Sequence, residues 1–460
     1  MTDRDDLSHE LARFAADARY AALPADAIEA AKKSLLDTLG VILAASGMEP
    51  AVKPLINLVQ DEAGKEQCTI LGFGGRVPAS RAALANGALA HCLDFDDQTP
   101  WGAHPDSSVI PTVIALAELK GGVSGEDLIT AIAVGQELFT RLRLNVGWHM
   151  DWNLSTAIGI FSATAAGGRV MRLSAEQIAS AMGIASMQSS GTMELIFGVG
   201  SDLRGMYAGF TSQAAVQAVQ LAQRGMTGIP NLFEGEAGHF KVYFKGEYNR
   251  DKMLEKLGTQ FLSGGMLYKR WPAVGNAHTY IHAAIELMKE NELELDQIKE
   301  IRVYVGDFQQ RMCSPLPIRQ APGTLVDAKF SLPFLVALAL AKGKMDVADF
   351  SSEALRDERI LALARKVVPV PDASFNWTLK LPDGKLVVVM TNGQAIERLG
   401  SNVPGTADRP MTWDDLDLKF AACAKVAAKP IEPEKITRVQ RLIRHLEACR
   451  DATELVRAIG

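Results

Sequence analysis

The chain has 460 residues, of which 48% are hydrophobic and 22% are charged. This composition is too apolar for a disordered protein, and the length allows two or three domains with a sizeable core. The 48 Lys and Arg residues against 54 Asp and Glu residues give a formal charge of −6. Because no general positive field exists to attract a polyanion, we expect no nucleic-acid partner, and any anion site has to be local.

Five scattered cysteines form no CxxC pair and no Cys/His set at zinc-ligand spacing. Neither a disulfide framework nor a structural zinc site is therefore predicted. The acidic N-terminus lacks the apolar region of a signal peptide, and no stretch reaches 18 uninterrupted apolar residues. We expect a cytoplasmic protein with no membrane partner.

The first 270 or so residues show helical periodicity almost throughout. Ser124 with Asp127, and Ser174 with Gln177, are N-terminal capping signals for two of these helices, and Gly225 is a helix stop. Apolar residues cover much of each helix circumference. This pattern predicts a multi-helix bundle with at least one buried central helix.

Short β-type segments alternate with helices after residue 268. Residues 298–308 alternate as a strand does, and residues 375–391 contain two β-rich runs joined by Pro382-Asp383-Gly384, a sequence typical of a hairpin. A helix ending at Gly343 lies between them.

Two amphipathic segments, 412–428 and 434–450, then return the chain to helix. The predicted fold is therefore mainly α: a large, discontinuous all-helical bundle domain of residues 1–268 and 405–460, and a smaller α+β domain of residues 269–404.

The most unusual local sequence is HCLDFDDQTPWGAHP, at residues 91–105. His91, Asp94 and Asp97 follow one another at i, i+3 and i+6, which predicts that they lie near one helix face, and His104 follows in a loop. His and Asp clusters can bind divalent ions, but the metal-binding spacings HExxH and DxDxDG are absent, so no metal is predicted. In the structural alternative, the acids cap or salt-bridge the junction between two helices.

A second cluster, YKRWPAVGNAHTYIH, lies where the composition changes. Lys269 and Arg270 form a cationic pair beside Trp271, and His278 follows within a turn or two. Such a pair beside a domain seam is suited to a carboxylate or phosphate, although a solvated surface pair is the simpler alternative.

Other basic residues admit a structural interpretation. Arg204 and Tyr207 lie one turn apart before a Gly- and Ala-rich helix, where packing alone explains them. Arg141 and Arg143 end a helix, where cations complement the dipole, so we interpret both as structural. No glycine motif follows the nucleotide-binding patterns, and no nucleotide cofactor is expected.

At these clusters the chain resembles the MmgE/PrpD family, which includes 2-methylcitrate dehydratase, cis-aconitate decarboxylase and iminodisuccinate epimerase. The resemblance runs nearly end to end and depends on a series of segments in order. They are LLDTLG at 35–40, HCLDFDD followed by HP, the glycine-rich helix after Asn153, EGEAG at 234–238, KRWP followed by His278, DAKFSLPF at 327–334, and the late DLDLKF.

The resemblance implies an all-helical domain completed by the C-terminus, a smaller α+β domain, a site between them and a homodimer. It also implies chemistry without metal or organic cofactor on small polycarboxylates. In that chemistry a base moves a proton next to a carboxylate and cations hold the anion. Carried over by position, Asp94 matches the acid of the DxDD motif, His104 the HP histidine, Lys269 the KxxP lysine, and His278 the histidine nine residues later.

The resemblance suggests a role for each of these residues. We expect His104 to be the general base or acid, Asp94 to orient a catalytic group or the substrate, Lys269 to bind a carboxylate, and His278 to supply a second titratable group. Substrate contacts are expected from Arg204 as a second clamp and from Tyr207, Arg270, Asn153 and Gln98.

Several positions depart from the decarboxylase branch of the family. Gln98 replaces a threonine, Asn153 and Val274 each replace a histidine, and Arg204 replaces a lysine. Asparagine exchanges no proton near pH 7, and arginine, with a pKa above about 12, clamps anions but is a poor base. A decarboxylase that needs the second histidine is therefore not expected, although His149 is a candidate to replace it in space.

The sequence thus predicts a homodimeric MmgE/PrpD-type enzyme that abstracts a proton from a small di- or tricarboxylate, with dehydration as the first choice. One alternative is an epimerase of an iminodisuccinate-like polycarboxylate, which needs two opposed bases. Another is a catalytically inactive, carboxylate-binding homologue. The substitutions at Asn153 and Val274 are the reason for this alternative.

Overall fold

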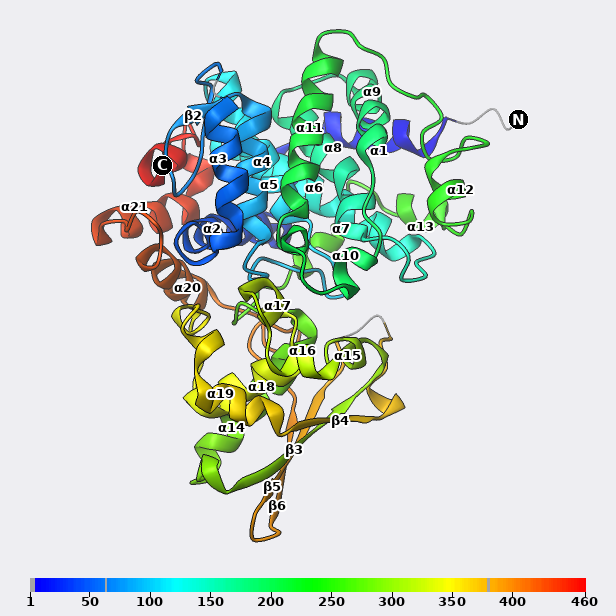
Figure 1. The fold of residues 1–460 in the computed structure, drawn as a ribbon. Coiled ribbons are helices and arrows are strands. Elements are labelled where there is room, and N and C mark those ends of the chain that lie inside the picture. Colours follow the sequence, from blue (N-terminus) through cyan, green and yellow to red (C-terminus); the bar gives the residue numbers. More distant parts are fainter. Residues whose placement is uncertain (1–4, 63, 379–380) are drawn as a thin grey trace.

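The computed structural model describes residues 5–62, 64–378 and 381–460. Helices dominate, and the strands gather in one small part, so the predicted mainly α class with a smaller α+β part is confirmed. In Figure 1 the N-terminal helices form the large upper part, and the mixed sheet with its helices forms the lower part. The C-terminal helices return to the upper part beside α2.

The larger part is built mainly from helices that pack around α2 and α6. Its helices are α1 (Leu7–Asp17), α2 (Ala25–Met48), α3 (Lys53–Glu62), α4 (Ala79–His91), α5 (Asp106–Lys120), α6 (Gly125–Asn145), α7 (Leu154–Ala157), α8 (Gly159–Val170), α9 (Ala175–Ala185), α10 (Glu194–Phe197), α11 (Tyr207–Gln223), α12 (His239–Tyr243), α13 (Arg250–Leu254), α20 (Trp413–Lys425), α21 (Pro433–Arg444) and α22 (Glu454–Ile459). A two-stranded ribbon of β1 (Cys68–Thr69) and β2 (Arg76–Val77) is attached to it.

The predicted helix signals are found where the sequence places them. Ser124 accepts a hydrogen bond from the backbone N–H of Asp127, and Ser174 with Gln177 forms a complete capping box. Gly225 follows the end of α11 with a φ of 92°, a left-handed conformation that favours glycine. These local signals therefore predict the helix ends correctly.

Helices α4 and α11 pack very closely and carry two residues of the candidate site at their ends. A Cβ at Gly209 would lie 2.4 Å from the carbonyl oxygen of Leu84 and 2.9 Å from the backbone nitrogen of Ala88. Only a residue without a side chain allows this approach. The close contact places Tyr207, at the start of α11, beside His91, at the end of α4.

The smaller part has a four-stranded sheet in the order β4-β3-β5-β6. Strands β3 and β4 are parallel, and the other pairs are antiparallel. Its elements are α14 (His278–Glu290), β3 (Ile298–Val305), α15 (Asp307–Arg311), α16 (Leu316–Gln320), α17 (Leu325–Lys329), α18 (Leu332–Lys342), α19 (Glu358–Arg365), β4 (Val367–Pro371), β5 (Gly384–Met390) and β6 (Ala395–Gly400).

The predicted hairpin at Pro382-Asp383-Gly384 is wrong. The described residues of the first run, 375–378 and 381, form no strand, and residues 379 and 380 lie outside the described part of the chain. The hairpin instead joins β5 to β6, where Gly393 adopts a φ of 86°. The segment before β5 follows another course because Asp307 accepts a hydrogen bond from the backbone N–H of Trp377, which ties this segment to α15.

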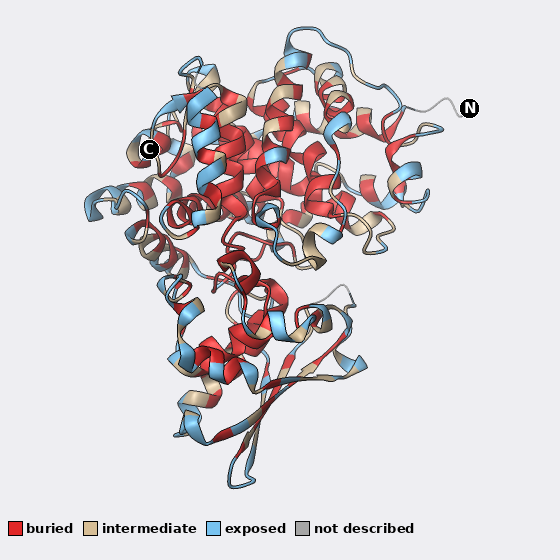
Figure 2. Cartoon of the chain, in the orientation of Figure 1, coloured by how far each residue is buried: buried red, intermediate tan, exposed pale blue. Residues whose placement is uncertain are grey.

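The buried apolar residues form two clusters. One draws on the N-terminal part of the chain up to Tyr268, on Val347 and on residues from Met411 onward, and the other has its members between Trp271 and Val403. Figure 2 shows the larger cluster as the buried centre of the upper part. The domain boundaries at 268/269 and 404/405 remain our prediction, and the seam between the clusters is where the candidate site lies.

Among the described residues, no single helix has both the length and the apolar character of a membrane span. The bent pair of α2 and the segment Pro50–Glu62 meets these criteria only when the two are taken together.

The α4–α11 contact provides a test of the packing. We expect Gly209→Ala to lower the free energy of unfolding by about 1–3 kcal/mol, because the new methyl group meets backbone atoms that cannot yield. Phe210→Ala, at the next and solvent-exposed position, should change it by less than about 0.5 kcal/mol. Urea denaturation of both variants measures the difference, and equal stabilities would contradict the packing argument.

Candidate active site

A cavity of about 120 Å³ lies between the two parts of the molecule. A single water needs roughly 15 Å³ of such space, so the cavity has room for a small organic ligand. The larger part contributes the loop after α4 and the starts of α7 and α11, and the smaller part contributes residues 274–276 and several aromatic side chains. The site is therefore assembled from segments far apart in the sequence.

The loop after α4 does not continue the helix, so the prediction that His91, Asp94 and Asp97 share a helix face is wrong. Helix α4 ends at His91, and Asp94 takes a left-handed conformation with a φ of 48°. Such a conformation is costly for a residue other than glycine and is found mainly at turns and functional sites. It turns the chain so that acids of the loop point in different directions.

Three buried lysines hold this loop by donating to its backbone carbonyls. They come from α17, from the segment between the two parts, and from α20. The hydrogen bonds run from Lys329 to Cys92 at 2.6 Å, from Lys269 to Asp94 at 3.0 Å, and from Lys419 to Phe95 at 2.6 Å.

Each of the three lysines also has a buried acidic partner. Lys269 pairs with the side chain of Asp94, Lys329 pairs with that of Glu49, and Lys419 lies 2.6 Å from that of Asp37. Because an unpaired buried charge is expensive, these pairs make the loop geometry a joint property of four chain segments.

The carboxylate of Asp94 lines the cavity, with Lys269 behind it. Burial raises the pKa of this carboxyl, but Lys269, His104 and His91 lower it more, so the pKa lies below its usual range. Oδ1 contacts Lys269, whereas Oδ2 has no hydrogen-bond partner among the described residues. Asp94 therefore presents an ionised oxygen that can accept a hydrogen bond from a ligand.

His104 is held as a neutral imidazole with a defined tautomer. Its Nδ1 contacts the backbone carbonyl of Asp97, and because a carbonyl only accepts, Nδ1 carries the proton. Its Nε2 is then unprotonated and lies 3.9 Å from Oδ1 of Asp94. Burial, followed by the charge of Lys269, lowers the pKa of His104 to about 4. At neutral pH this side chain is therefore a base.

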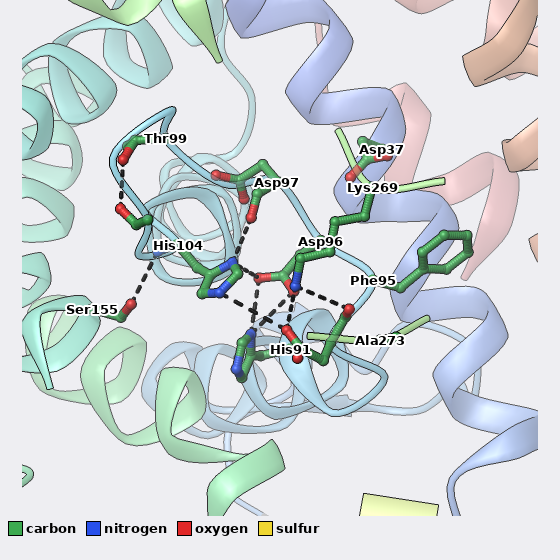
Figure 3. A network of polar contacts seen from close by, with 12 residues as sticks. Asp37, His91, Phe95, Asp96, Asp97, Thr99, His104, Ser155, Lys269 and Ala273 are labelled. Carbon is green, nitrogen blue, oxygen red and sulfur yellow. Dashed lines mark hydrogen bonds and ion pairs between the residues drawn. The ribbon is translucent and has the colours of Figure 1, made fainter. Parts of the chain in front are cut away.

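A second imidazole, His91, completes a compact polar network (Figure 3). Its Nδ1 lies 2.9 Å from Asp96, whose carboxylate lies 3.6 Å from Nδ1 of His104. The ring of Tyr207 packs 4.3 Å from that of His91, and burial raises the pKa of Tyr207 well above its usual range. The phenol thus stays protonated beside the cavity that it lines.

Buried acids surround this network on the side away from the cavity. Burial and mutual repulsion raise the pKa of Asp97 well above its usual range, and burial raises the pKa of Asp106 to about 7. Both oxygens of Asp97 lack a hydrogen-bond partner among the described residues. A carboxyl group in such a place is stable only as the neutral acid.

The His and Asp residues of this network raise the question of whether it binds a metal ion. One ligand atom each from His91, Asp94, Asp96 and His104 lies within 4.8 Å of the others. The Lys269 ammonium already pairs with Asp94 and repels a second cation, so the donor set fits a metal poorly. A metal-free site stays our prediction.

Of the other predicted residues, some line the cavity and some do not. Gln98, Asn153 and Val274 line the cavity, and Nδ2 of Asn153 has no hydrogen-bond partner among the described residues. The exposed His149 pairs with Glu247. It therefore does not take the place of the histidine that the decarboxylase branch has at the position of Asn153.

Four predicted residues do not line the cavity. Lys269 lies behind Asp94, and Arg204 is buried over the ring of Phe330, 3.1 Å from its centroid. His278 is buried with Nε2 3.2 Å from the Ala273 carbonyl, and Arg270 is exposed. Their functional roles stay predictions, and in this conformation none of the four lines the cavity.

Sequence analysis missed Arg143, which lines the cavity from the end of α6. A structural role suits Arg141, which pairs with Glu137 inside the helical part, although Arg143 rather than Arg141 lies in the last turn of α6. Residues two positions apart point to different sides of a helix. The spacing of Arg141 and Arg143 was therefore the signal that their side chains have different surroundings.

Comparison with protein families adds an independent observation to this geometry. Residues 9–251 match the MmgE/PrpD N-terminal domain, and residues 271–444 match the MmgE/PrpD C-terminal domain. The chain belongs to the MmgE/PrpD family. The resemblance inferred from the motifs is thereby confirmed.

Known relatives are distant but cover most of the chain. A cis-aconitate decarboxylase-like protein, oryM, of Aspergillus oryzae is 25% identical over 100% of this chain and 98% of its own length. The human cis-aconitate decarboxylase is 24% identical over 83% of this chain and 80% of its own. The 2-methylcitrate dehydratase of Salmonella typhimurium is 23% identical over 78% of this chain and 77% of its own.

Lys419 tests how far the loop depends on its ammonium donors. We expect Lys419→Met to lower the free energy of unfolding by about 3–5 kcal/mol, because it leaves the buried Asp37 unpaired. Asp37→Asn in the same chain should recover part of the loss. Lys425→Met, at an exposed position of the same helix, is the matched control, and a loss as large there would contradict the prediction.

The protonation of His104 is open to direct measurement. We expect its ring to stay neutral from pH 5.5 to 8, because its pKa lies at about 4 rather than near 6.5. The neutral form persists above the lowered value and is lost only as the pH falls through it. NMR of the labelled histidines, with His104→Gln to assign the signal, measures this, and a midpoint near 6.5 would show that the site is not desolvated.

Proposed function

We propose that this protein is a lyase that dehydrates a small di- or tricarboxylate, without a metal or an organic cofactor. The proposal depends mainly on the neutral imidazole of His104, whose unprotonated Nε2 lies beside the ionised Asp94 in the wall of the cavity. A buried neutral base can remove a proton from a carbon next to a carboxylate at ordinary pH.

The first step in the proposed mechanism is proton transfer to His104. Nε2 takes the proton from the carbon, and the positive charge that forms on the ring is stabilised by Asp96 and Asp94, at 3.6 and 3.9 Å. The carbonyl of Asp97 keeps the ring in its orientation. The acids thus stabilise the charged state that exists only after the proton has moved.

The second step, loss of hydroxide, requires an acid. Tyr207 lines the same cavity and stays protonated, so its phenol can donate to the leaving hydroxyl group. The free Oδ2 of Asp94 can accept a hydrogen bond from that hydroxyl in the bound substrate. Water leaves, and a carbon–carbon double bond forms between the two carbons that lost the proton and the hydroxyl.

The relatives support the substrate class and leave the reaction open between two kinds of lyase. Their names include 2-methylcitrate dehydratase and cis-aconitate decarboxylase, at similar identity. Asn153 in the cavity wall cannot return a proton to carbon, which decarboxylation requires after loss of carbon dioxide. This difference is our reason to prefer dehydration.

An epimerase is the second candidate. It needs two bases on opposite faces of one carbon, and the described cavity wall offers His91 and His104 as its imidazoles. Nδ1 of His91 is held by Asp96, and the two rings lie close together, with centroids 5.0 Å apart. Two bases on one side of the ligand suit elimination better than inversion. An inactive, carboxylate-binding homologue is the third candidate.

The proposal is tested in two stages. A thermal-shift screen with 2-methylcitrate, citrate, cis-aconitate and saturated di- and tricarboxylates identifies the ligand class, because a ligand that binds the folded state raises the melting temperature. Turnover of a stabilising hydroxy acid is then followed by the ultraviolet absorbance of the new double bond. Deuterium uptake without absorbance would instead indicate an epimerase, and binding without either would indicate an inactive homologue.

His104 is the residue on which the mechanism depends. We expect His104→Gln to lower kcat by about 10²–10⁴-fold, because glutamine keeps the polarity but removes the base. His445→Gln, the same change at an exposed histidine, should leave kcat unchanged. Retention of turnover in His104→Gln, with the fold intact by circular dichroism, would overturn the mechanism.

The homodimer and the cytoplasmic location stay predictions. The homodimer is what the family resemblance implies, and light scattering of the purified protein tests it.

A further inference from the structure

Arg143 is the only lysine or arginine among the described residues that line the cavity. It belongs to the last turn of α6 and keeps 4% of its surface exposed. The three cations expected to hold the substrate, Lys269, Arg204 and Arg270, lie outside this wall. The positive charge nearest to a bound anion is therefore one that the proposed function has not used.

This guanidinium has no acidic partner among the described residues. Its Nη2 donates to the carbonyl of Trp101 at 2.7 Å, and its planar group lies 5.1 Å from the ring centroid of Trp148. Its Nε is buried without a hydrogen-bond partner. Arg141, on the same helix, contrasts with it, because Arg141 forms an ion pair with Glu137 at 2.6 Å and three hydrogen bonds to carbonyls.

A buried cation without a counterion is costly, and the cost is removed when an anion enters the same cavity. Burial is also the one influence that lowers the pKa of Arg143, to about 10, so the group stays charged at neutral pH. The contacts with Trp101 and Trp148 fix the planar group in position before a ligand arrives. An arginine held in this way recognises a carboxylate through its remaining N–H groups.

We propose that Arg143 binds a carboxylate of the substrate that is remote from the reacting carbon, and so selects polycarboxylates over monocarboxylates. This inference rests on the proposed function and deepens it, because it names the residue that binds the second carboxylate. A purely structural role would need only the hydrogen bond to Trp101, which a neutral amide can also donate.

The test is a double-difference binding experiment with tricarballylate and its monoamide. Tricarballylate has three carboxylates and no hydroxyl group, so it binds without being dehydrated. Calorimetry gives Kd for both ligands with the wild type, Arg143→Gln, Arg143→Lys and Arg224→Gln. Arg224 is an exposed arginine at the C-cap of α11 and does not line the cavity.

We expect the amide to bind the wild type about 10- to 100-fold more weakly than the triacid, which is the usual range for a charge-assisted contact. In Arg143→Gln the ratio should fall below about threefold, because the cation that distinguishes carboxylate from amide is gone. Arg143→Lys should keep an intermediate ratio, and Arg224→Gln the wild-type ratio.

The outcomes separate this inference from the proposed function. An unchanged ratio in Arg143→Gln, or equal weakening of both ligands, overturns the role of Arg143 and leaves the polycarboxylate lyase in place. Failure of the wild type to bind tricarballylate and every member of the polycarboxylate panel overturns the substrate class, and the role of Arg143 with it. A melting temperature of Arg143→Gln close to that of the wild type shows that the fold is retained.

Discussion

Everything in the candidate site depends on three buried ammonium groups that satisfy the carbonyls of the loop after α4. A chain that leaves a helix inside a protein exposes carbonyls that water cannot reach, and these must find donors. Lys269, Lys329 and Lys419 supply them, and each is paired with an acid. The donors come from the smaller part, from the seam and from the C-terminal helices. Two of the three acids, Asp37 and Glu49, come from α2 and its C-cap. The same contacts that join the parts of the molecule therefore also shape the loop.

This arrangement separates the acids of the loop by charge state. Asp94 has a lysine behind it and stays ionised, whereas Asp97 faces other acids and is neutral. His104 lies between these surroundings, with its proton on Nδ1 and its Nε2 free. The loop therefore brings an acceptor, a base and a stabilising charge close together, and it includes the left-handed turn at Asp94.

The cavity also agrees with the proposal of an anionic substrate for a protein of net charge −6. Among the described residues that line the cavity, Asp94 is the one acid and is paired with Lys269 behind it. The one lysine or arginine in this lining is Arg143, which donates to the Trp101 carbonyl and lies over the Trp148 ring. The proposed sign of the ligand therefore follows from local geometry rather than from the overall charge. The family relatives act on polycarboxylates by their names, which agrees with a site of this kind.

Sequence by itself determined the signals at the ends of α6, α9 and α11, the mainly α class with a smaller α+β part, and the closeness of His91, Asp94 and His104 along the chain, because capping, periodicity and motif order are local properties. It failed at the hairpin near residue 383, at the end of α4 and at Arg143. Those features depend on contacts between distant segments: the tie of Trp377 to Asp307, the lysines that pull the loop out of helix, and the direction in which α6 presents each arginine. Only the tertiary structure decided which cation faces the ligand, because a side chain's partner in the interior is chosen by the segments that pack around it.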